Sequence, residues 1–242
     1  MQAWFESIKA EFILNFVQAN RWKYLVNGLG NTLLITLLAL LLGLVIGVII
    51  AAVRSTYDKT AEGARPTIGR KIFGFFNFLC KVYLTVLRGT PVVVQLMIIF
   101  FVIFAASDNG VLVAALAFGL NSGAYVAEII RGGIMSIDNG QFEAGRSLGF
   151  NYLQTMQYIV LPQVIKNVLP SLLNEFIALL KETSVACYVA VQDLTKGGDI
   201  IRGRTYSAFM PLIAVALIYL ALVTFFSWIV GKVERRLRNS ER

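Results

Sequence analysis

Long apolar runs alternate with short polar segments along the chain, and this pattern decides its fold class. A membrane-spanning helix needs roughly 20 mostly apolar residues. The pattern predicts five spans, over residues 28–53, 92–106, 111–130, 165–191 and 206–230. Residues 72–87 are predicted to be an amphipathic approach to the second span, or to join it as one helix kinked at Pro91.

Composition supports burial of this apolar surface in lipid. The chain has 242 residues, of which 57% are hydrophobic and 15% are charged, whereas soluble domains carry about 25% charged residues. A chain of this size cannot bury so much apolar surface in one globular core. The sequence therefore predicts an all-α membrane protein.

The basic residues predict how the chain is oriented. The net charge is +8, and Lys and Arg collect in residues 54–71 and in the tail after Gly231. Cytoplasmic loops carry an excess of Lys and Arg, so these segments and the polar loop 131–162 are assigned to the cytoplasm. Five spans then leave the N-terminus outside and the C-terminus inside. Because the basic residues lie in short segments between apolar runs, a nucleic-acid-binding surface is not expected.

Three regions follow along the chain. Residues 1–26 mix charged and aromatic side chains and are interpreted as an interfacial lead-in segment rather than a secretory signal. Residues 27–231 form the membrane domain, with a polar breaker at Arg65-Pro66 between the first two spans. Residues 232–242 are a basic cytoplasmic tail.

The sequence argues against several kinds of chemistry. It contains no histidine, which removes the commonest general base and metal ligand. Its two cysteines, Cys80 and Cys187, lie in apolar stretches, so neither a disulfide framework nor a metal cluster is expected. It has no phosphate-binding loop of the Gly-x-x-x-x-Gly-Lys-Ser/Thr type. These absences argue against an intramembrane enzyme. A secondary transporter that works alone is the other alternative; it is expected to show an inverted repeat, and the sequence contains no convincing one.

Polar residues inside the spans are candidates for a substrate pathway, because ionisable groups in lipid are costly. Asn121, Tyr125 and Glu128 share one face of the third span, and Glu128 is expected to pair with Arg131. The fourth span carries Glu175, Lys181 and Glu182. One interpretation pairs Glu175 with a substrate amine and Lys181 with a substrate carboxylate. The alternative is that Lys181 and Glu182 pair with each other or with a second subunit.

Arg88, just before Thr90 and Pro91, has three interpretations: a hinge residue, a pathway cation, or a side chain that extends to the cytoplasmic headgroups. Small residues form two further faces, Gly43 and Gly47 in the first span and Ala115, Gly119, Gly123 and Ala127 in the third. Such faces let helices approach closely. Five helices are few for an enclosed pathway, which favours a dimer.

Motifs then indicate a family. Glu143-Ala144-Gly145, then Gly149 and, further on, Leu161-Pro162 resemble the EAA signature of ABC-importer permeases, with Gly145 in place of the second alanine. Three other segments, 88–96, 121–128 and 174–184, resemble polar amino-acid permeases.

The resemblance implies a type I ABC-importer permease fold, with residues 137–162 forming a helix that docks on an ATP-hydrolysing subunit. Glu143 would contact a basic residue of that subunit, Gly149 would permit a sharp turn, and Pro162 would stop the helix. The alternative is an amphipathic helix that rests on lipid headgroups. The coupling residues implied are Glu143, Ala144, Gly145, Gly149, Leu161 and Pro162, and the pathway residues expected are Asn121, Ser122, Tyr125, Glu175, Lys181, Glu182, Arg88, Thr90 and Gln95.

The resemblance also implies partners: two ATPase subunits, a second permease copy or paralogue, an extracellular amino-acid-binding protein and membrane lipid. ATP and magnesium would belong to the ATPase, so that this chain needs no cofactor and is not itself an enzyme. A bacterial plasma membrane is the expected location. Polar amino acids are the implied substrates, and arginine, glutamine, glutamate, histidine and cystine all remain open.

Overall fold

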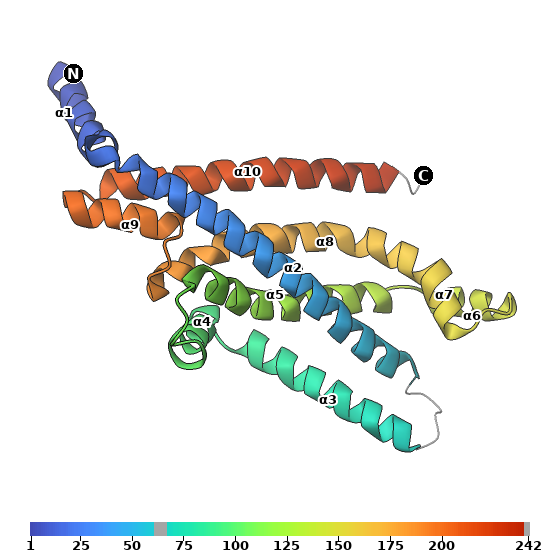
Figure 1. Cartoon of the computed structure of the whole chain (residues 1–242). Helices are drawn as coiled ribbons and strands as arrows, with labels where there is room; N and C mark the ends of the chain where they lie inside the picture. The colour runs from blue at the N-terminus through green and yellow to red at the C-terminus, as the bar shows by residue number, and fades with distance from the viewer. Residues whose placement is uncertain (61–66, 240–242) are drawn as a thin grey trace. The chain divides into compact units, whose positions relative to one another are not determined.

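The computed structural model describes residues 1–60 and 67–239, and every regular element in these ranges is helical. The predicted breaker at Arg65-Pro66 and the last three residues of the tail lie outside these ranges. The α-helices in chain order (Figure 1) are α1 (Gln2–Phe12), α2 (Trp22–Thr60), α3 (Ile68–Gly89), α4 (Val92–Ile98), α5 (Gly110–Met135), α6 (Asn139–Ser147), α7 (Tyr152–Thr155), α8 (Leu161–Glu182), α9 (Leu194–Thr205) and α10 (Phe209–Asn239).

Four of the helices in the described ranges are long and apolar enough to cross a membrane. They are Trp22–Lys59, Ile68–Gly89, Gly110–Met135 and Phe209–Leu237. This set differs in part from the five predicted spans. α3 is one continuous helix of 22 residues, whereas the apolar helix after Thr90 covers only Val92–Ile103.

Two predicted segments are divided differently in the structure. Thr90 has an extended backbone (φ −120°, ψ 147°) and ends α3, because a residue before proline is disfavoured in the helical region. Residues 72–87 and 92–106 are therefore separate helices rather than one kinked helix. In the predicted span 165–191, α8 ends at Glu182, and a 3-10 helix, η5 (Thr183–Val189), completes the segment.

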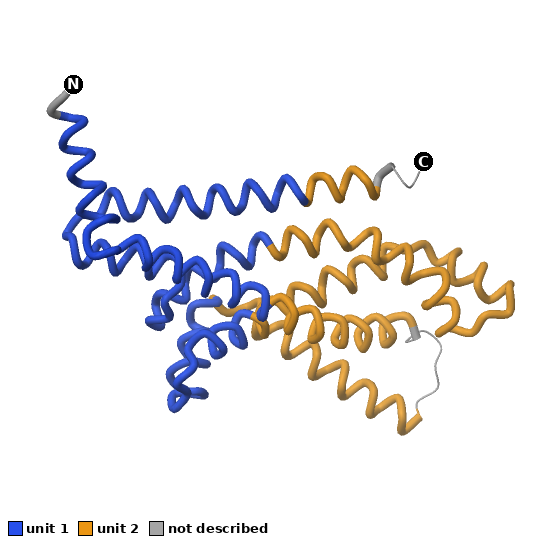
Figure 2. The backbone as a smooth tube through the Cα atoms, turned by 45° about the horizontal axis from the view of Figure 1, so that its top comes forward, with its two compact units in different colours: residues 1–39, 92–118, 177–229 blue, residues 40–91, 119–176, 230–242 orange. Residues whose placement is uncertain are grey.

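The chain divides into two compact units, which Figure 2 shows in different colours. Unit 1 contains residues 1–39, 92–118 and 177–229, and unit 2 contains residues 40–91, 119–176 and 230–242. In unit 1, the start of α2 packs on α9. A Cβ atom added at Gly28 would lie 2.4 Å from the carbonyl oxygen of Asp193. A Cβ atom added at Gly197 would lie 2.4 Å from the carbonyl oxygen of Tyr24. These two glycines let the backbones touch.

The loop that leads into α9 is fixed by hydrogen bonds to α2. The Thr32 hydroxyl accepts from the Leu194 amide (3.0 Å), and the Asn31 amide group donates to the Gln192 carbonyl (2.8 Å). Asp193 caps α9 by accepting from the amides of Thr195 and Lys196. Burial raises the pKa of the Asp193 carboxyl, and these hydrogen bonds oppose that shift.

In unit 2, α2 and α5 pack through their small residues. An added Cβ at Gly43 would lie 3.2 Å from the Gly123 amide nitrogen, and one at Gly47 would lie 2.4 Å from a Val126 methyl group. The expectation that small residues permit close helix approach is confirmed, and within this unit the two faces meet each other in one chain. Ile50, Leu84, Ala124 and Ala127 form the adjoining apolar core.

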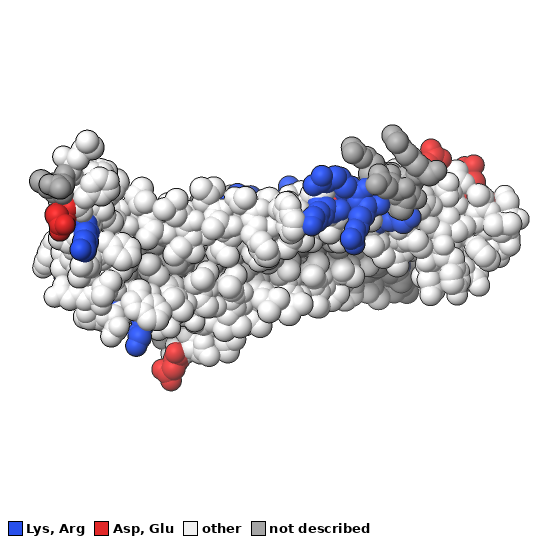
Figure 3. Space-filling view, turned by 90° about the horizontal axis from the view of Figure 1, so that it is seen from above, with Lys and Arg blue, Asp and Glu red and all other residues white. Residues whose placement is uncertain are grey.

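Charge is unevenly distributed on the surface. On the face drawn in Figure 3, Lys and Arg gather over the C-terminal end of α10, and most of the rest of that face is uncharged. The basic residues described there include Lys232, Arg235 and Arg236. This agrees with the basic tail predicted from the sequence.

Candidate functional site

A short helical knob, which we define as residues 137–162, connects α5 to α8. Asp138 begins α6 by accepting a hydrogen bond from the Gly140 amide (2.6 Å). α6 ends at a left-handed glycine, Gly149, with φ +83°. The Phe150 amide donates to the Gly145 carbonyl and the Gly149 amide to the Arg146 carbonyl, a pair of bonds that closes the helix end. The predicted turn at Gly149 is confirmed.

The outer surface of the knob is both charged and apolar. Glu143, Ala144 and Arg146 are exposed on α6. Leu148 is 71% exposed and Leu153 is 73% exposed. Exposed leucines beside a carboxylate and a guanidinium are suited to a protein partner, which covers apolar surface and pairs charge together.

The inner surface of the knob holds α6 on α7. The rings of Phe142 and Tyr152 stack with centroids 6.2 Å apart and planes 13° apart. Burial raises the pKa of the Tyr152 phenol, so this hydroxyl keeps its proton at neutral pH. Gly145 is buried, and an added Cβ would lie 2.5 Å from Oγ1 of Thr155. The glycine that departs from the EAA pattern is therefore required by the contact with Thr155.

The C-terminal end of α2 is tied to the knob. Nζ of Lys59 donates to Oδ1 of Asn139 (2.7 Å) and lies 4.8 Å from the centre of the Phe142 ring. Below this tie is an open concavity of about 420 Å³. It is lined by Asp58, Lys59, Met135, Asn139, Phe142, Glu143, Arg146, Tyr152 and Thr155. The knob is therefore in direct contact with the C-terminal end of α2.

The expectation that Pro162 stops a helix is wrong. The chain stays helical from α7 through a π-helical turn, η4 (Met156–Val160), into α8, and Pro162 lies in the first turn of α8. A π-turn changes the hydrogen-bond pattern locally, so that the helix can accommodate Pro162, which has no amide proton to donate. Leu161 and Pro162 are both exposed.

Four predicted pathway residues come together in unit 2. Asn121 and Ser122 are buried on α5 (4% and 1% exposed). The Asn121 side chain donates to the Leu87 carbonyl at the end of α3 (3.1 Å), and the Ser122 hydroxyl donates to Oε1 of Glu175 on α8 (2.9 Å). Tyr125 lies one turn further along α5 and is 37% exposed.

Of the other predicted pathway residues, Arg88 and Thr90 also belong to unit 2, whereas Gln95, Lys181 and Glu182 belong to unit 1. The Thr90 hydroxyl donates to the Val86 carbonyl, so it helps to end α3. Gln95 is 8% exposed in α4, within unit 1. Lys181 and Glu182, at the end of α8 in the same unit, are both exposed, and no ion pair within 4 Å joins them to each other or to the rest of the described chain. Their predicted pairing is not found inside this chain.

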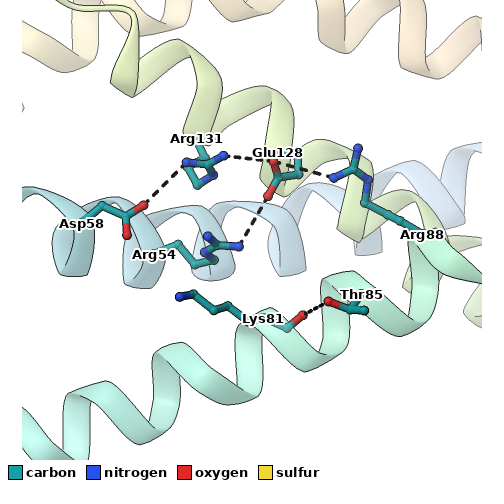
Figure 4. Close-up of polar contacts among 7 residues, drawn as sticks. All are labelled: Arg54, Asp58, Lys81, Thr85, Arg88, Glu128 and Arg131. Atoms are coloured by element: carbon teal, nitrogen blue, oxygen red, sulfur yellow. Dashed lines mark hydrogen bonds and ion pairs between the residues drawn. The ribbon is translucent and has the colours of Figure 1, made fainter.

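Glu128 lies at the centre of an arginine cluster (Figure 4). Its carboxylate accepts a hydrogen bond from Arg131 (3.2 Å), as expected. It also lies 3.6 Å from Nη1 of Arg54 and 3.7 Å from Nη1 of Arg88. Arg131 reaches Asp58 on α2 as well (3.6 Å). The cluster thus joins α2, α3 and α5.

Sequence reasoning missed Arg54 and Arg88 as partners of Glu128, and it left Lys81 without a role. The signal for Lys81 and Arg88 lay in α3, where Asn77, Lys81, Thr85 and Arg88 recur on one helical face. No comparable pattern connects Arg54 to Glu128, because their contact depends on how α2 crosses α5.

Long apolar helices with polar groups buried between them are typical of a membrane protein. The chain belongs to the family of binding-protein-dependent transport system inner membrane components, whose family model matches residues 67–239. Within that family its relatives are permeases of amino-acid ABC transporters.

Two relatives illustrate this. A putative glutamine transport system permease protein GlnP of Rickettsia bellii is 39% identical over 181 residues, which cover 69% of this chain and 83% of that protein. The arginine transport system permease protein ArtQ of Bacillus subtilis is 38% identical over 169 residues, covering 69% of this chain and 77% of that protein.

Solved structures agree with this family. A chain in the crystal structure of an amino acid ABC transporter with histidines is 37% identical, with a TM-score of 0.78, covering 91% of this chain and 97% of the other. A chain of the inward-facing MetNI methionine ABC transporter has a TM-score of 0.74 at 18% identity, covering 91% of this chain and 98% of its own, and shows the fold alone.

Proposed function

We propose that this chain is the permease of an ATP-driven importer and translocates a polar amino acid that an extracellular binding protein delivers. The observation that carries the proposal is the knob, which presents Glu143 and Arg146 outward and is tied by Lys59 to α2. Such a tie turns the movement of a soluble partner into the movement of a membrane helix.

The partner is proposed to be an ATPase subunit, which holds the ATP and magnesium. Glu143 pairs with a basic residue of that subunit, while Leu148 and Leu153 fill an apolar groove beside it. Two ATPase subunits act on two permeases, this chain together with a second copy or a paralogue. Closure of the ATPases moves the two knobs together and opens the pathway outward.

The membrane arrangement proposed has five crossings: α2, the α3–α4 segment, α5, α8 with η5, and α10. The N-terminus is outside and the C-terminus in the cytoplasm of a bacterial cell. The basic residues at the end of α10 and in residues 54–71 support this orientation. Residues 1–26 rest at the outer interface, where the exposed Trp4 and Phe5 suit the headgroup region.

The substrate site is proposed to lie between α5 and α8, at Asn121, Ser122 and Glu175. The Glu175 carboxylate, oriented by Ser122, receives the ammonium group that every amino acid carries. Because the relatives named above include glutamine and arginine permeases, the substrate class proposed is a polar amino acid.

The test is reconstitution. The chain is co-expressed with a candidate ATPase subunit of an amino-acid importer from the same organism. The complex is purified, placed in liposomes and supplied with a candidate binding protein and a radiolabelled amino acid. Uptake that requires ATP inside the liposomes supports the proposal. Uptake by the chain alone, driven by an ion gradient, identifies a secondary transporter and overturns it. The charge reversal Glu143→Lys is the matched variant, and it should prevent the ATPase from co-purifying.

A further inference from the structure

A second polar pocket lies beside the Glu128 cluster, further along α5 than the proposed substrate site. It is an open hollow of about 610 Å³, lined by Arg54, Lys81, Leu84, Thr85, Arg88, Gly89, Tyr125 and Glu128. All of these residues belong to unit 2. The pocket therefore rests on contacts within one compact unit.

Positive charge exceeds negative charge around this pocket. The residues drawn in Figure 4 include four basic side chains and two acidic ones, which leave a net charge of +2. An excess of charge between membrane helices is costly unless a counter-ion is present. The pocket is therefore suited to an anion.

The hydrogen-bond donors also exceed the acceptors. Glu128 accepts a hydrogen bond from Arg131, but its distances to Arg54 and Arg88 are 3.6 Å and 3.7 Å, longer than a hydrogen bond. Nε of Arg54 is buried without a hydrogen-bond partner among the described residues. The Lys81 ammonium makes no hydrogen bond or ion pair within residues 1–60 and 67–239. The Lys81 ammonium and the guanidinium of Arg88, whose side chain is 44% exposed, can serve an incoming ligand.

The chemistry of the donors selects a carboxylate. Guanidinium groups match the planar fork of a carboxylate, and an ammonium adds a point charge. Glu128 already shows that such a group fits between Arg54 and Arg88. The centre of the Tyr125 ring lies 5.6 Å from the Arg88 guanidinium. This ring lines the pocket and can pack against the side chain of a bound amino acid.

The position of the pocket relates it to transport. Glu128 follows Asn121 by seven residues, a rise of about 10 Å along α5. Asn121 also donates to Leu87, the residue next to Arg88. The Glu128 end of the pocket therefore lies about two helical turns beyond Asn121, and Tyr125 and Arg88 lie between the two.

We propose that the pocket of Arg54, Lys81, Arg88 and Tyr125 is a second binding station, which receives the carboxylate of the transported amino acid after it leaves Glu175. This inference rests on the proposed function. Lys81 and Arg88 make the first contact, and the ligand competes with Glu128 for the guanidinium of Arg88. The cation pair thereby draws the amino acid along α5 toward the knob.

The experiment compares Lys81→Gln and Arg88→Gln with the wild-type complex of permease and ATPase. Each variant should lower ATP-driven uptake by roughly tenfold, because a hydrogen bond to a charged group is lost. Lys71→Gln, on the same helix but outside the pocket, is the control and should transport as the wild type does. Uptake by both pocket variants at the wild-type rate overturns the proposal.

A binding measurement tests the anion site independently of ATP-driven transport. The thermal stability of the purified complex is followed as acetate replaces isethionate at constant ionic strength. Acetate should raise the melting temperature of the wild type and of Lys71→Gln, but not of Lys81→Gln or Arg88→Gln. An equal rise in all four proteins overturns a carboxylate site at this pocket.

A phosphate-bearing lipid is the competing source of negative charge. The acetate measurement is therefore repeated in nanodiscs of phosphatidylcholine and of phosphatidylglycerol. An effect that persists in both supports a site for a small carboxylate, whereas its loss only in phosphatidylglycerol identifies a lipid headgroup and overturns the proposal. A wild-type complex without ATP-driven uptake overturns the proposed function and the transport role together, while the acetate shift still reports the anion site.

Discussion

The Ser122 hydroxyl donates a hydrogen bond to Oε1 of Glu175, and this 2.9 Å contact joins α5 to α8. A hydroxyl that donates to a carboxylate fixes the orientation of that carboxylate. The pair thus has the properties required to hold the ammonium of a bound amino acid. Substitutions of Glu175 and of Ser122 are expected to affect transport to different extents, and together they test the proposed substrate site.

Glu175→Gln should keep the fold and lose transport. A glutamine carbonyl still accepts from Ser122, whereas the negative charge is gone, so uptake should fall by tenfold or more, about 1.4 kcal/mol of binding. Ser122→Ala removes the hydrogen bond and keeps the charge, and should reduce uptake less. Uptake kinetics of both variants in liposomes provide the measurement. If Glu175→Gln transports with unchanged KM and rate, the carboxylate has only a packing role.

Gly145→Ala should destabilise the knob. The new methyl group would lie 2.5 Å from Oγ1 of Thr155, and such overpacking costs about 1–3 kcal/mol. The double variant with Thr155→Ala removes the two nearest atoms and should recover most of the loss. Thermal unfolding of the purified complex compares the three proteins. A single variant as stable as the wild type would show that Thr155 moves aside freely.

Lys59→Met should separate ATP hydrolysis from transport. The substitution keeps the length of the side chain but removes both the hydrogen bond to Asn139 and the cation over Phe142. The ATPase rate should stay near the wild-type value while uptake falls several-fold, because the knob then moves without α2. Lys59→Arg keeps both contacts and serves as the control. Equal coupling ratios in the two variants would contradict this role of Lys59.

Asp193→Asn should change how stability depends on pH. Because burial raises the folded-state pKa of this carboxyl above its unfolded value, the folded protein binds the proton more tightly. Stability gained from Asp193 therefore appears as pH falls through the raised pKa, and is lost again as pH rises through it. Asparagine removes the buried charge but has a single acceptor oxygen, whereas Asp193 accepts from the Lys196 amide with Oδ1 and from the Thr195 amide with Oδ2. The variant should therefore lose this pH dependence while it keeps only one of the two cap bonds.

Two controls accompany this measurement. Asp193→Ala loses both the titratable group and the cap, and loss of the cap should cost about 1 kcal/mol. Asp199 behaves oppositely, because hydrogen bonds with Arg202 and Lys196 lower its pKa, so its contribution is present above the unfolded pKa and is lost as pH falls. Melting temperatures across the acid range should show these opposite slopes. Identical profiles for wild type and Asp193→Asn would argue against the raised pKa.

The sequence predicted well what depends on local pattern. Apolar runs indicated three of the four long apolar helices, those that correspond to residues 28–53, 111–130 and 206–230. Small residues indicated faces of close helix approach, and Gly149 indicated the turn that ends α6. Glu128 and Arg131, three residues apart on one helix, were paired correctly. Each of these features is decided by neighbouring residues or by helical periodicity.

What depends on three-dimensional crossing could not be read from the sequence. In the sequence, Gly145 is only a departure from the second alanine of the EAA pattern. The structure shows that Thr155 occupies the space that an alanine Cβ would need. Arg54 and Arg88 reach Glu128 from two other helices, across separations that carry no periodic signal. Pro162 was expected to stop a helix. The π-turn before it, through which the helix continues, has no signature in a single sequence.

The glycine contact of α2 with α5 constrains any cycle of opening and closing. Two backbones this close, with a Val126 methyl group where a Cβ on Gly47 would stand, cannot slide past each other without a collision. In the proposed transport cycle, α2 and α5 would therefore move together as one body, and any change of access would involve the helices packed around them.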